Sequence, residues 1–293
     1  MRFNSLLVVV FLVLTLVIAG CGGASTSDKA GKQDTLRVGL VPNQAPDKIK
    51  AQYEPFRKYL SEKLNMPVEL FVATDYAGVV EAMANDKLDV AYFGGLTYVQ
   101  AKQRAKIHPI VTEIDQETKT TKYYSLIIAP AEKDTKSVGE LKGKVFAFGD
   151  ISSTSGSLYP RVMLDKAGIK VPDDFKNVVY TGGHDATAQA VQNGAVDAGG
   201  IEGRILKRLI AKDTVDEAKI KVLERHLVEG YPWVVRDSLD KQLEAKIVDA
   251  FLTMKDPVLL DLMRAEGFAK VSNETYAEAE QEAKRLGLLN PKK

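Results

Sequence analysis

Apolar residues follow two different patterns along this chain of 293 residues. Near the N-terminus they form one run, residues 6–18, which only Thr15 interrupts. From Leu36 onwards, short apolar segments alternate with segments in which apolar residues recur at helical spacing, about every 15–20 residues. This alternation predicts an α/β fold whose sheets are rich in parallel strands.

The short apolar segments predict strands, and the periodic segments predict helices. Strands are expected at 36–41, 68–72, 88–93, 107–114, 123–129, 145–148, 178–180, 196–198 and 220–223. Helices are expected at 50–64, 76–85, 97–104, 155–167, 185–193, 201–212, 239–254, 257–265 and 274–286. We expect the chain to cross into a second lobe at 123–129 and to return at 226–235. The expected fold is a two-lobed α/β clamshell with two hinge crossovers, made of lobe 1 (36–127 and 230–293) and lobe 2 (128–229).

The N-terminal apolar run predicts a secretion signal. It is shorter than the roughly 20 residues that span a membrane, and it has the length of the hydrophobic region of a signal peptide. The residues at its end, Ile18-Ala19-Gly20-Cys21, look like a bacterial lipobox, in which the cysteine thiol takes a diacylglycerol. We therefore expect a lipoprotein signal peptide at 1–20, a lipid on Cys21 and a flexible tether at 21–35. The alternative is a cysteine buried at the end of an anchor helix.

Composition and charge exclude several classes of protein. With 40 basic and 39 acidic residues, the chain lacks the basic field of a nucleic-acid-binding protein. Its single cysteine excludes an intramolecular disulfide and a cysteine-based zinc site, and its three histidines are not spaced like metal ligands. No G-x-S-x-G, H-E-x-x-H or S-x-x-K with a KTG-type triplet is present. We expect no catalytic residue, metal or cofactor; the alternative, a secreted hydrolase or transferase, would need an activated nucleophile or a metal.

The strongest candidate site is the hydroxyl-rich segment 149–156, between an expected strand and an expected helix. The unpaired N–H groups and the dipole at a helix N-terminus favour an anion. The hydroxyls of Ser153, Thr154 and Ser155 add donors without positive charge, which suits a tetrahedral oxyanion that is held reversibly. The segment lacks the P-loop pattern, and the alternative is a helix N-cap with some extra loop polarity.

Two further segments carry candidate ligand contacts. His184 also stands between a strand and a helix and could donate to the same anion; the alternative is a histidine packed at a helix entry. Tyr76 opens an expected helix, and Tyr92 and Phe93 end an expected strand. Because adjacent strand residues face opposite sides, only one of Tyr92 and Phe93 should reach a ligand.

In these segments the sequence resembles the substrate-binding lipoproteins of phosphonate/phosphite-type ABC importers, across roughly residues 36–251. The resembling motifs stand in order at matching spacing: residues 75–78, 89–94, 153–156 with Pro160, 183–185, 190–197 and 232–236. The resemblance implies a type II-like periplasmic-binding-protein clamshell. The binding residues that it implies are Tyr76, Tyr92 or Phe93, Ser153, Thr154, Ser155 and His184.

Departures from the family's motifs bear on the ligand. Members that take aminoalkyl phosphonates place carboxylates near the hinge, where this chain has Arg204 and Tyr231 at the best-matching positions. Glu202 and Glu229 lie close by in the sequence and are the alternative partners for an amine. With Arg204 and Tyr231 as ligand contacts, we expect a small oxyanion such as phosphite, methylphosphonate or a phosphate analogue.

The resemblance also implies partners and a location. The partners are the oxyanion, an ABC permease and ATPase complex, and the membrane through the lipid on Cys21, with no nucleic acid and a monomeric protein. The location is the extracytoplasmic face of the cell membrane. Two alternatives stay open at this point: a non-phosphorus oxyanion such as selenate, and a sensor domain that takes no part in transport.

Overall fold

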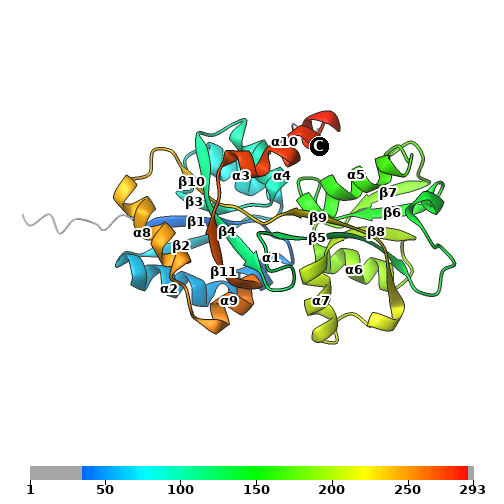
Figure 1. Cartoon of the computed structure of the whole chain (residues 1–293), viewed down its shortest axis with the longest axis horizontal. Helices are drawn as coiled ribbons and strands as arrows, with labels where there is room; N and C mark the ends of the chain where they lie inside the picture. The colour runs from blue at the N-terminus through cyan, green and yellow to red at the C-terminus, as the bar shows by residue number, and fades with distance from the viewer. Residues whose placement is uncertain (1–34, 290–293) are drawn as a thin grey trace, which may run out of the picture. The chain divides into compact units, whose positions relative to one another are not determined.

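The computed structural model describes residues 35–289, which belong to one compact unit, Asp34–Lys293. The expected signal peptide, Cys21 and nearly all of the expected tether lie outside the described residues. Within the described part of the chain, no helix combines the length and the hydrophobicity needed to cross a membrane. The described residues form two lobes, each built on one mixed β-sheet (Figure 1).

The first lobe is built on a six-stranded sheet with the order β11-β4-β10-β3-β1-β2. Its strands are β1 (Leu36–Leu40), β2 (Val68–Val72), β3 (Val90–Tyr92), β4 (Ile107–Asp115), β10 (Trp233–Arg236) and β11 (Ala265–Lys270). Strand β1 pairs in parallel with β2 and β3, whereas β10 pairs antiparallel with β3 and β4. The helices of this lobe are α1 (Pro46–Gln52), α2 (Glu54–Leu64), α3 (Tyr76–Ala84), α4 (Gly95–Lys102), α8 (Lys241–Leu252), α9 (Pro257–Met263) and α10 (Ala277–Arg285), with the 3-10 turn η4 (Asn273–Tyr276).

The second lobe is built on a five-stranded sheet with the order β7-β6-β8-β5-β9. Its strands are β5 (Lys122–Pro130), β6 (Val145–Phe148), β7 (Asn177–Tyr180), β8 (Ala198–Glu202) and β9 (Ile220–Glu229). Its helices are α5 (Tyr159–Lys166), α6 (His184–Gln192) and α7 (Gly203–Ala211), with the short turns η1 (Val138–Leu141), η2 (Thr154–Leu158) and η3 (Glu217–Lys219). Helix α5 covers one face of this sheet, and α6 and α7 cover the other (Figure 1).

Strands β5 and β9 form the hinge between the lobes. They pair antiparallel over their full lengths, from Lys122 opposite Glu229 to Pro130 opposite Ile220. The chain therefore passes from the first sheet to the second after β4, and returns between β9 and β10. We expected the first crossover within 123–129, but the whole of β5 belongs to the second sheet.

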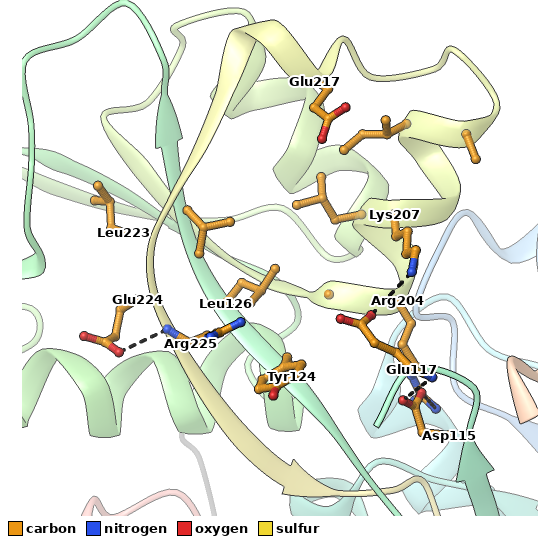
Figure 2. Close-up of a pocket in the computed structure, with 15 residues that line it drawn as sticks. Asp115, Glu117, Tyr124, Leu126, Arg204, Lys207, Glu217, Leu223, Glu224 and Arg225 are labelled. Carbon is orange, nitrogen blue, oxygen red and sulfur yellow. Dashed lines mark hydrogen bonds and ion pairs between the residues drawn. The ribbon is translucent and has the colours of Figure 1, made fainter. Parts of the chain in front are cut away.

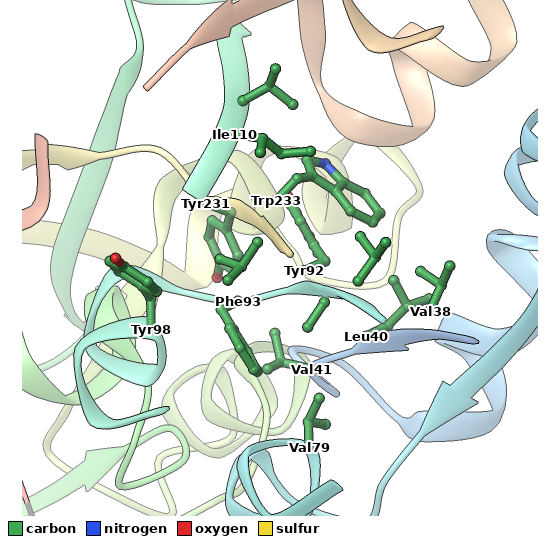
Figure 3. Close-up of a cluster of buried hydrophobic side chains, with 14 of the residues drawn as sticks. Val38, Leu40, Val41, Val79, Tyr92, Phe93, Tyr98, Ile110, Tyr231 and Trp233 are labelled. Carbon is green, nitrogen blue, oxygen red and sulfur yellow. The ribbon is translucent and has the colours of Figure 1, made fainter. Parts of the chain in front are cut away.

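The core of the first lobe extends to the hinge through stacked aromatic side chains. Tyr92 packs on Trp233 and on Tyr231, with ring centroids 4.7 and 5.1 Å apart, and all three side chains are buried. Figure 3 shows this stack on one side of β3 and Phe93 on the other side. Each such ring buries a large apolar area, and offset ring pairs add about 0.5–1.5 kcal/mol. The stack fixes Tyr231 at the second crossover.

The expectation of parallel-rich sheets was wrong, because five of the nine pairs of described strands are antiparallel. The return of the chain accounts for two of these pairs, because β10 enters the first sheet from the second lobe and runs antiparallel to β3 and β4. Strand β11 was not expected, because the pattern predicts a helix at 257–265 and no element at 266–273. That helix ends at Met263, where Arg264 takes a left-handed conformation (φ 58°), and the next six residues pair with β4.

We predict that Gly200→Ala destabilises the second lobe. A Cβ at Gly200, on β8, would lie 2.5 Å from Cγ of Pro160 and 3.1 Å from the carbonyl oxygen of Gly156. Overpacking of this kind costs about 1–3 kcal/mol, which urea denaturation measures. Gly267→Ala, on β11, is the matched control, because nothing lies within 4 Å of its Cβ position. Equal stability of the two variants would show that Pro160 can move aside.

Candidate functional site

The hydroxyl-rich segment begins a helix at the carboxyl end of β6. Ser153 caps this helix, because its Oγ accepts the N–H of Gly156 at 3.0 Å. The first turn is π-helical, and the N–H of Leu158 donates to the carbonyl of Ser153 at 3.0 Å. The N–H groups of a first turn find no acceptor within their own helix, so the turn after Ser153 favours a bound anion.

His184 opens α6 and lies against this turn. A Cβ on Gly156 would lie 3.0 Å from Cε1 of His184, so a glycine there makes room for the imidazole. Nδ1 of His184 accepts the backbone N–H of Glu202 at 3.2 Å, and Nε2 therefore carries the proton. Burial lowers the pKa of His184 to about 4, which keeps the ring neutral near pH 7. Its Nε2–H group is buried and has no hydrogen-bond partner among the described residues.

Tyr123 is a residue of this region that the sequence analysis did not assign to the site. It lies on β5 and is buried, and neither its hydroxyl nor that of Ser155 has a hydrogen-bond partner within residues 35–289. Burial raises the pKa of Tyr123, and the nearby Ser155 hydroxyl opposes the rise. Ser125, two residues along the same strand face, donates to the carbonyl of Ser155 at 2.9 Å. Side chains alternate between the two faces of a strand, so Tyr123 and Ser125 share one face. This pattern could have assigned Tyr123 to the site from the sequence.

Tyr76 brings the first lobe to the same place. Its N–H, at the start of α3, lies 3.3 Å from Oδ2 of Asp150, which accepts it. Burial raises the pKa of the Tyr76 hydroxyl well above its usual value, and the side chain of Ser153 opposes the rise. The hydroxyl therefore keeps its proton near pH 7 and can donate. We call Tyr76, Tyr123, Ser153, Ser155 and His184 the interlobe site.

Three of the expected contact residues have other partners in the structure. The hydroxyl of Tyr92 donates to the carboxylate of Glu113, and Phe93 lies in the core on the other side of β3. Thr154 Oγ1 accepts the N–H of Leu96 at 2.9 Å, which joins the second lobe to α4 of the first. The Thr154 hydroxyl, which we expected to contact the ligand, therefore joins the two lobes.

The remaining two expected residues, Arg204 and Tyr231, surround a buried carboxylate. Glu202 Oε1 accepts a hydrogen bond from Nε of Arg204 at 2.8 Å, and Oε2 accepts one from the hydroxyl of Tyr231 at 2.8 Å. Burial opposes the ionisation of Glu202, but the neighbouring guanidinium groups outweigh it and lower its pKa to about 2. The guanidinium of Arg204 also lies over the ring of Tyr123, 4.2 Å from the ring centroid. Arg204 therefore contacts the interlobe site through the ring of Tyr123 and is hydrogen-bonded to Glu202.

A second guanidinium group, that of Arg264, shares this carboxylate. Its Nε lies 3.5 Å from Oε1 of Glu202, and the side chain is buried. The role of Arg264 is not visible in the sequence, because a lone basic residue at the end of an expected helix is usually solvated. Nothing near it in the sequence points to Glu202.

The electrostatics of the site favour a compact anion. Arg204 is hydrogen-bonded to Glu202, while Ser155 Oγ, Tyr123 OH and His184 Nε2 are buried without a partner among the residues described. A buried polar group left unpaired costs about 1–3 kcal/mol. An oxyanion can accept from hydroxyl and imidazole donors of this kind, and the arrangement then binds it without a full counter-charge.

Comparison with known proteins gives consistent relatives. Residues 38–276 match the family described as ABC transporter, phosphonate, periplasmic substrate-binding protein. The chain is 30% identical over 251 residues to the phosphate-import protein PhnD of Mycolicibacterium smegmatis, covering 81% of this chain and 78% of that one. It is 27% identical over 274 residues to the probable ABC transporter phosphite binding protein PhnD1 of Prochlorococcus marinus, covering 87% and 90%. The structure of PhnD1 from Prochlorococcus marinus in complex with methylphosphonate matches with a TM-score of 0.80 at 25% identity, covering 87% and 98%.

We predict that His184 makes the free energy of unfolding depend on pH between about 4 and 6.5. Burial lowers its pKa from 6.5 to about 4 in the folded protein. The unfolded state then binds more protons in this window, so stability falls as the pH is lowered through it. His184→Gln should remove this dependence, which amounts to about 3 kcal/mol at most. Urea denaturation of both proteins from about pH 4 to 7 measures it.

The control for this prediction is His108→Gln. His108 is a partly exposed histidine that contacts Asp237 and Glu244, far along the chain from the interlobe site. A pH profile that is unchanged in His184→Gln would contradict the neutral, buried imidazole.

Proposed function

The chain belongs to the family of periplasmic substrate-binding proteins of phosphonate ABC transporters, and we propose that it binds a small phosphorus oxyanion between its two lobes. As a member of this family it is the substrate-binding component of an ABC importer and acts outside the cytoplasm. The family consists of binding proteins rather than enzymes. The permease and ATPase of the importer are its partners.

The observation that carries the proposal is the set of buried donors without acceptors at the interlobe site. Ser155, Tyr123 and His184 contribute a hydroxyl, a phenol and an imidazole N–H, in addition to the N–H groups of the helix start at Thr154. All of these donors are neutral. A tetrahedral oxyanion presents acceptors in several directions, so it satisfies donors that come from a turn, a strand and a helix start. Burying such an anion is favourable only when it is hydrogen-bonded on many sides.

The names of the relatives support a phosphorus oxyanion. One curated relative is named for the import of phosphate and another for the binding of phosphite. The matching solved structure holds methylphosphonate. None of these three ligands carries an amine. We propose the same class for this chain, namely phosphite, methylphosphonate or a phosphate analogue.

The pairing of the nearby carboxylates supports a ligand without an amine. Glu202 already accepts hydrogen bonds from Arg204 and Tyr231, so an ammonium group would have to displace a guanidinium from it. Glu229 forms an ion pair with Lys122, with Oε1 and Nζ 2.9 Å apart, and is also engaged. The guanidinium of Arg204 also places a positive charge next to Glu202. A cationic tail is therefore disfavoured.

Hydrogen bonds between the lobes suggest how the ligand is enclosed. Leu96 N–H donates to Thr154 Oγ1 at 2.9 Å, and the hydroxyl of Thr97 donates to the carbonyl of Ser152 at 2.9 Å. The N–H of His184 donates to the carbonyl of Asn43 at 3.0 Å. A ligand held by Tyr76 and by the second-lobe donors favours this joined arrangement over an open one. We propose that the joined form docks on the permease.

We also propose that a lipid on Cys21 holds the protein at the extracytoplasmic face of the cell membrane. The support is the lipobox-like sequence Ile18-Ala19-Gly20-Cys21 after an apolar run of signal-peptide length. A bacterial lipoprotein carries more than one acyl chain, which stable anchoring requires.

We predict that Cys21→Ser abolishes lipidation and releases the protein from the membrane. Cells fed radiolabelled palmitate should yield labelled protein in the membrane fraction for the unchanged chain, and unlabelled protein for the variant. Ser25→Ala, in the same polar segment, is the control and should behave like the unchanged chain. Membrane retention of unlabelled Cys21→Ser would point to an uncleaved anchor helix instead.

We predict that phosphite, methylphosphonate or phosphate raises the melting temperature of the purified protein. A ligand at about 100 times its Kd adds about 2.7 kcal/mol of stability. The panel includes 2-aminoethylphosphonate, sulfate and selenate, and the aminophosphonate should stabilise least among the phosphorus compounds. A rise in melting temperature with selenate alone would show that the ligand is not a phosphorus oxyanion. An equal shift with 2-aminoethylphosphonate would contradict the role given to the paired Glu202.

Variants of the site decide whether a shift arises there. Ser155→Ala and Tyr123→Phe each remove one donor to a charged ligand, which corresponds to about 1.5–3 kcal/mol, or a roughly tenfold to hundredfold loss of affinity. Ser137→Ala removes the hydroxyl of an exposed residue just before η1 and should leave the affinity unchanged. Wild-type affinity in both site variants would place the ligand elsewhere.

A further inference from the structure

A pocket with a volume of about 410 Å³ lies beside the first crossover. From the first lobe it is lined by residues at the ends of β4 and α9, namely Asp115, Gln116, Glu117, Asp261 and Arg264. From the second lobe it is lined by α7 and the residue after it, namely Arg204, Lys207, Arg208, Ala211 and Lys212. We call it the hinge pocket. It adjoins a larger pocket of about 850 Å³, and Figure 2 shows Arg204, Lys207, Asp115 and Glu117 gathered at the end that the two share.

The hinge pocket carries an excess of positive charge. Five of the side chains that line it are cationic and three are carboxylates. The cationic side chains are Arg204, Lys207, Arg208, Lys212 and Arg264. Each carboxylate stands near one cation: Asp115 at 3.7 Å from Arg204, Glu117 at 3.8 Å from Lys207 and Asp261 at 3.5 Å from Arg208. The lining residues therefore sum to a charge of about +2, since five minus three leaves two cations over; Glu202, which contacts Arg204 and Arg264 from outside the lining, reduces the local excess to about +1.

Two of these cations have buried N–H groups without acceptors. Nη2 of Arg204, and both Nε and Nη2 of Arg264, make no hydrogen bond to any described residue. Both side chains are buried, with 6% of the Arg204 side chain and 9% of the Arg264 side chain exposed. Glu202 does not satisfy Arg264, because 3.5 Å separates Oε1 from Nε without a hydrogen bond. Guanidinium groups bind oxyanions through paired, coplanar N–H donors, so these groups can donate to an oxyanion. Oδ2 of Asp115, which also lines the pocket, is likewise buried without a hydrogen-bond partner among the described residues.

We propose that the hinge pocket binds a second anion, a small oxyanion with two or more negative charges. Arg204 and Arg264 supply the buried donors, and Lys207 and Lys212 supply charge at the mouth. Phosphate and carboxylate groups share the chemistry that this site recognises. The site is separate from the interlobe site, which presents neutral donors.

The geometry couples this second anion to the interlobe site. The guanidinium of Arg208 on α7 donates to the carbonyls of Asp261 and Leu262, so the pocket spans the joined lobes. An anion that contacts both walls stabilises this joined arrangement. By linkage, any ligand that also requires the joined lobes binds more tightly, and the effect is reciprocal. This coupling rests on the proposed function, whereas the binding of the second anion does not.

Inorganic pyrophosphate is the probe, titrated into the purified protein by calorimetry. Lys207→Gln, at a largely exposed position, should weaken its binding about threefold to fivefold, and Arg264→Gln about tenfold or more. Lys136→Gln is the matched control, since it removes one exposed positive charge far along the chain. Ser155→Ala should leave pyrophosphate binding unchanged.

The outcomes separate the two sites. Loss of pyrophosphate binding in Ser155→Ala, with none in Lys207→Gln, would place the probe at the interlobe site and overturn the proposal. No binding to the unchanged protein would also overturn it. If no phosphorus oxyanion binds between the lobes but Lys207→Gln still weakens pyrophosphate, the hinge pocket stands and the proposed function falls. For the coupling, pyrophosphate should tighten methylphosphonate binding in the unchanged protein and leave it unaltered in Lys207→Gln.

Discussion

The binding region depends on one buried carboxylate, that of Glu202. Its side chain accepts hydrogen bonds from Arg204 and Tyr231, and its backbone N–H donates to Nδ1 of His184. A charge at this depth is stable only with such partners, because removing a carboxylate from water is costly. The same residue therefore fixes which nitrogen of His184 carries a proton and holds Tyr231 at the return crossover. It also draws two guanidinium groups to the hinge side of the molecule.

The two candidate anion sites differ in the charge of their unsatisfied donors. At the interlobe site the groups left without acceptors are neutral, and hydrogen bonds from neutral donors depend strongly on direction. Such donors discriminate by the shape of the anion more than by its charge. In the hinge pocket the unsatisfied groups belong to guanidinium ions, which attract charge over a longer range.

The fold and the function could be predicted from the sequence further than the contacts could. The alternation of strands and helices predicted two α/β lobes, and the motifs from Asp75 to Arg236 predicted the family; the structure and the family match confirm both. The local pattern of apolar residues does not determine the direction of β10, because that direction depends on how the chain returns from the second lobe. The local pattern predicted no element at residues 266–270, which form most of β11.

Side-chain partners that are distant in the sequence decided the rest of the site. The hydroxyl of Tyr92 is taken by Glu113, which no motif joins to it. Arg264 meets Glu202 only because α9 ends beside the hinge. The hydroxyl-rich turn itself was visible, since its residue types and its place before a helix are local features. The roles of Ser155 and His184 as ligand contacts stay predictions.

The turn that would hold the ligand is also a turn that joins the lobes, through Thr154 and Leu96. If the lobes joined without a ligand, the donors beside Thr154 would be removed from water without finding an acceptor. Each such donor would cost about 1–3 kcal/mol. On the proposed function, empty protein would therefore be biased towards separated lobes. A permease that responds to joined lobes would then meet chiefly loaded protein, and the importer would hydrolyse little ATP without cargo.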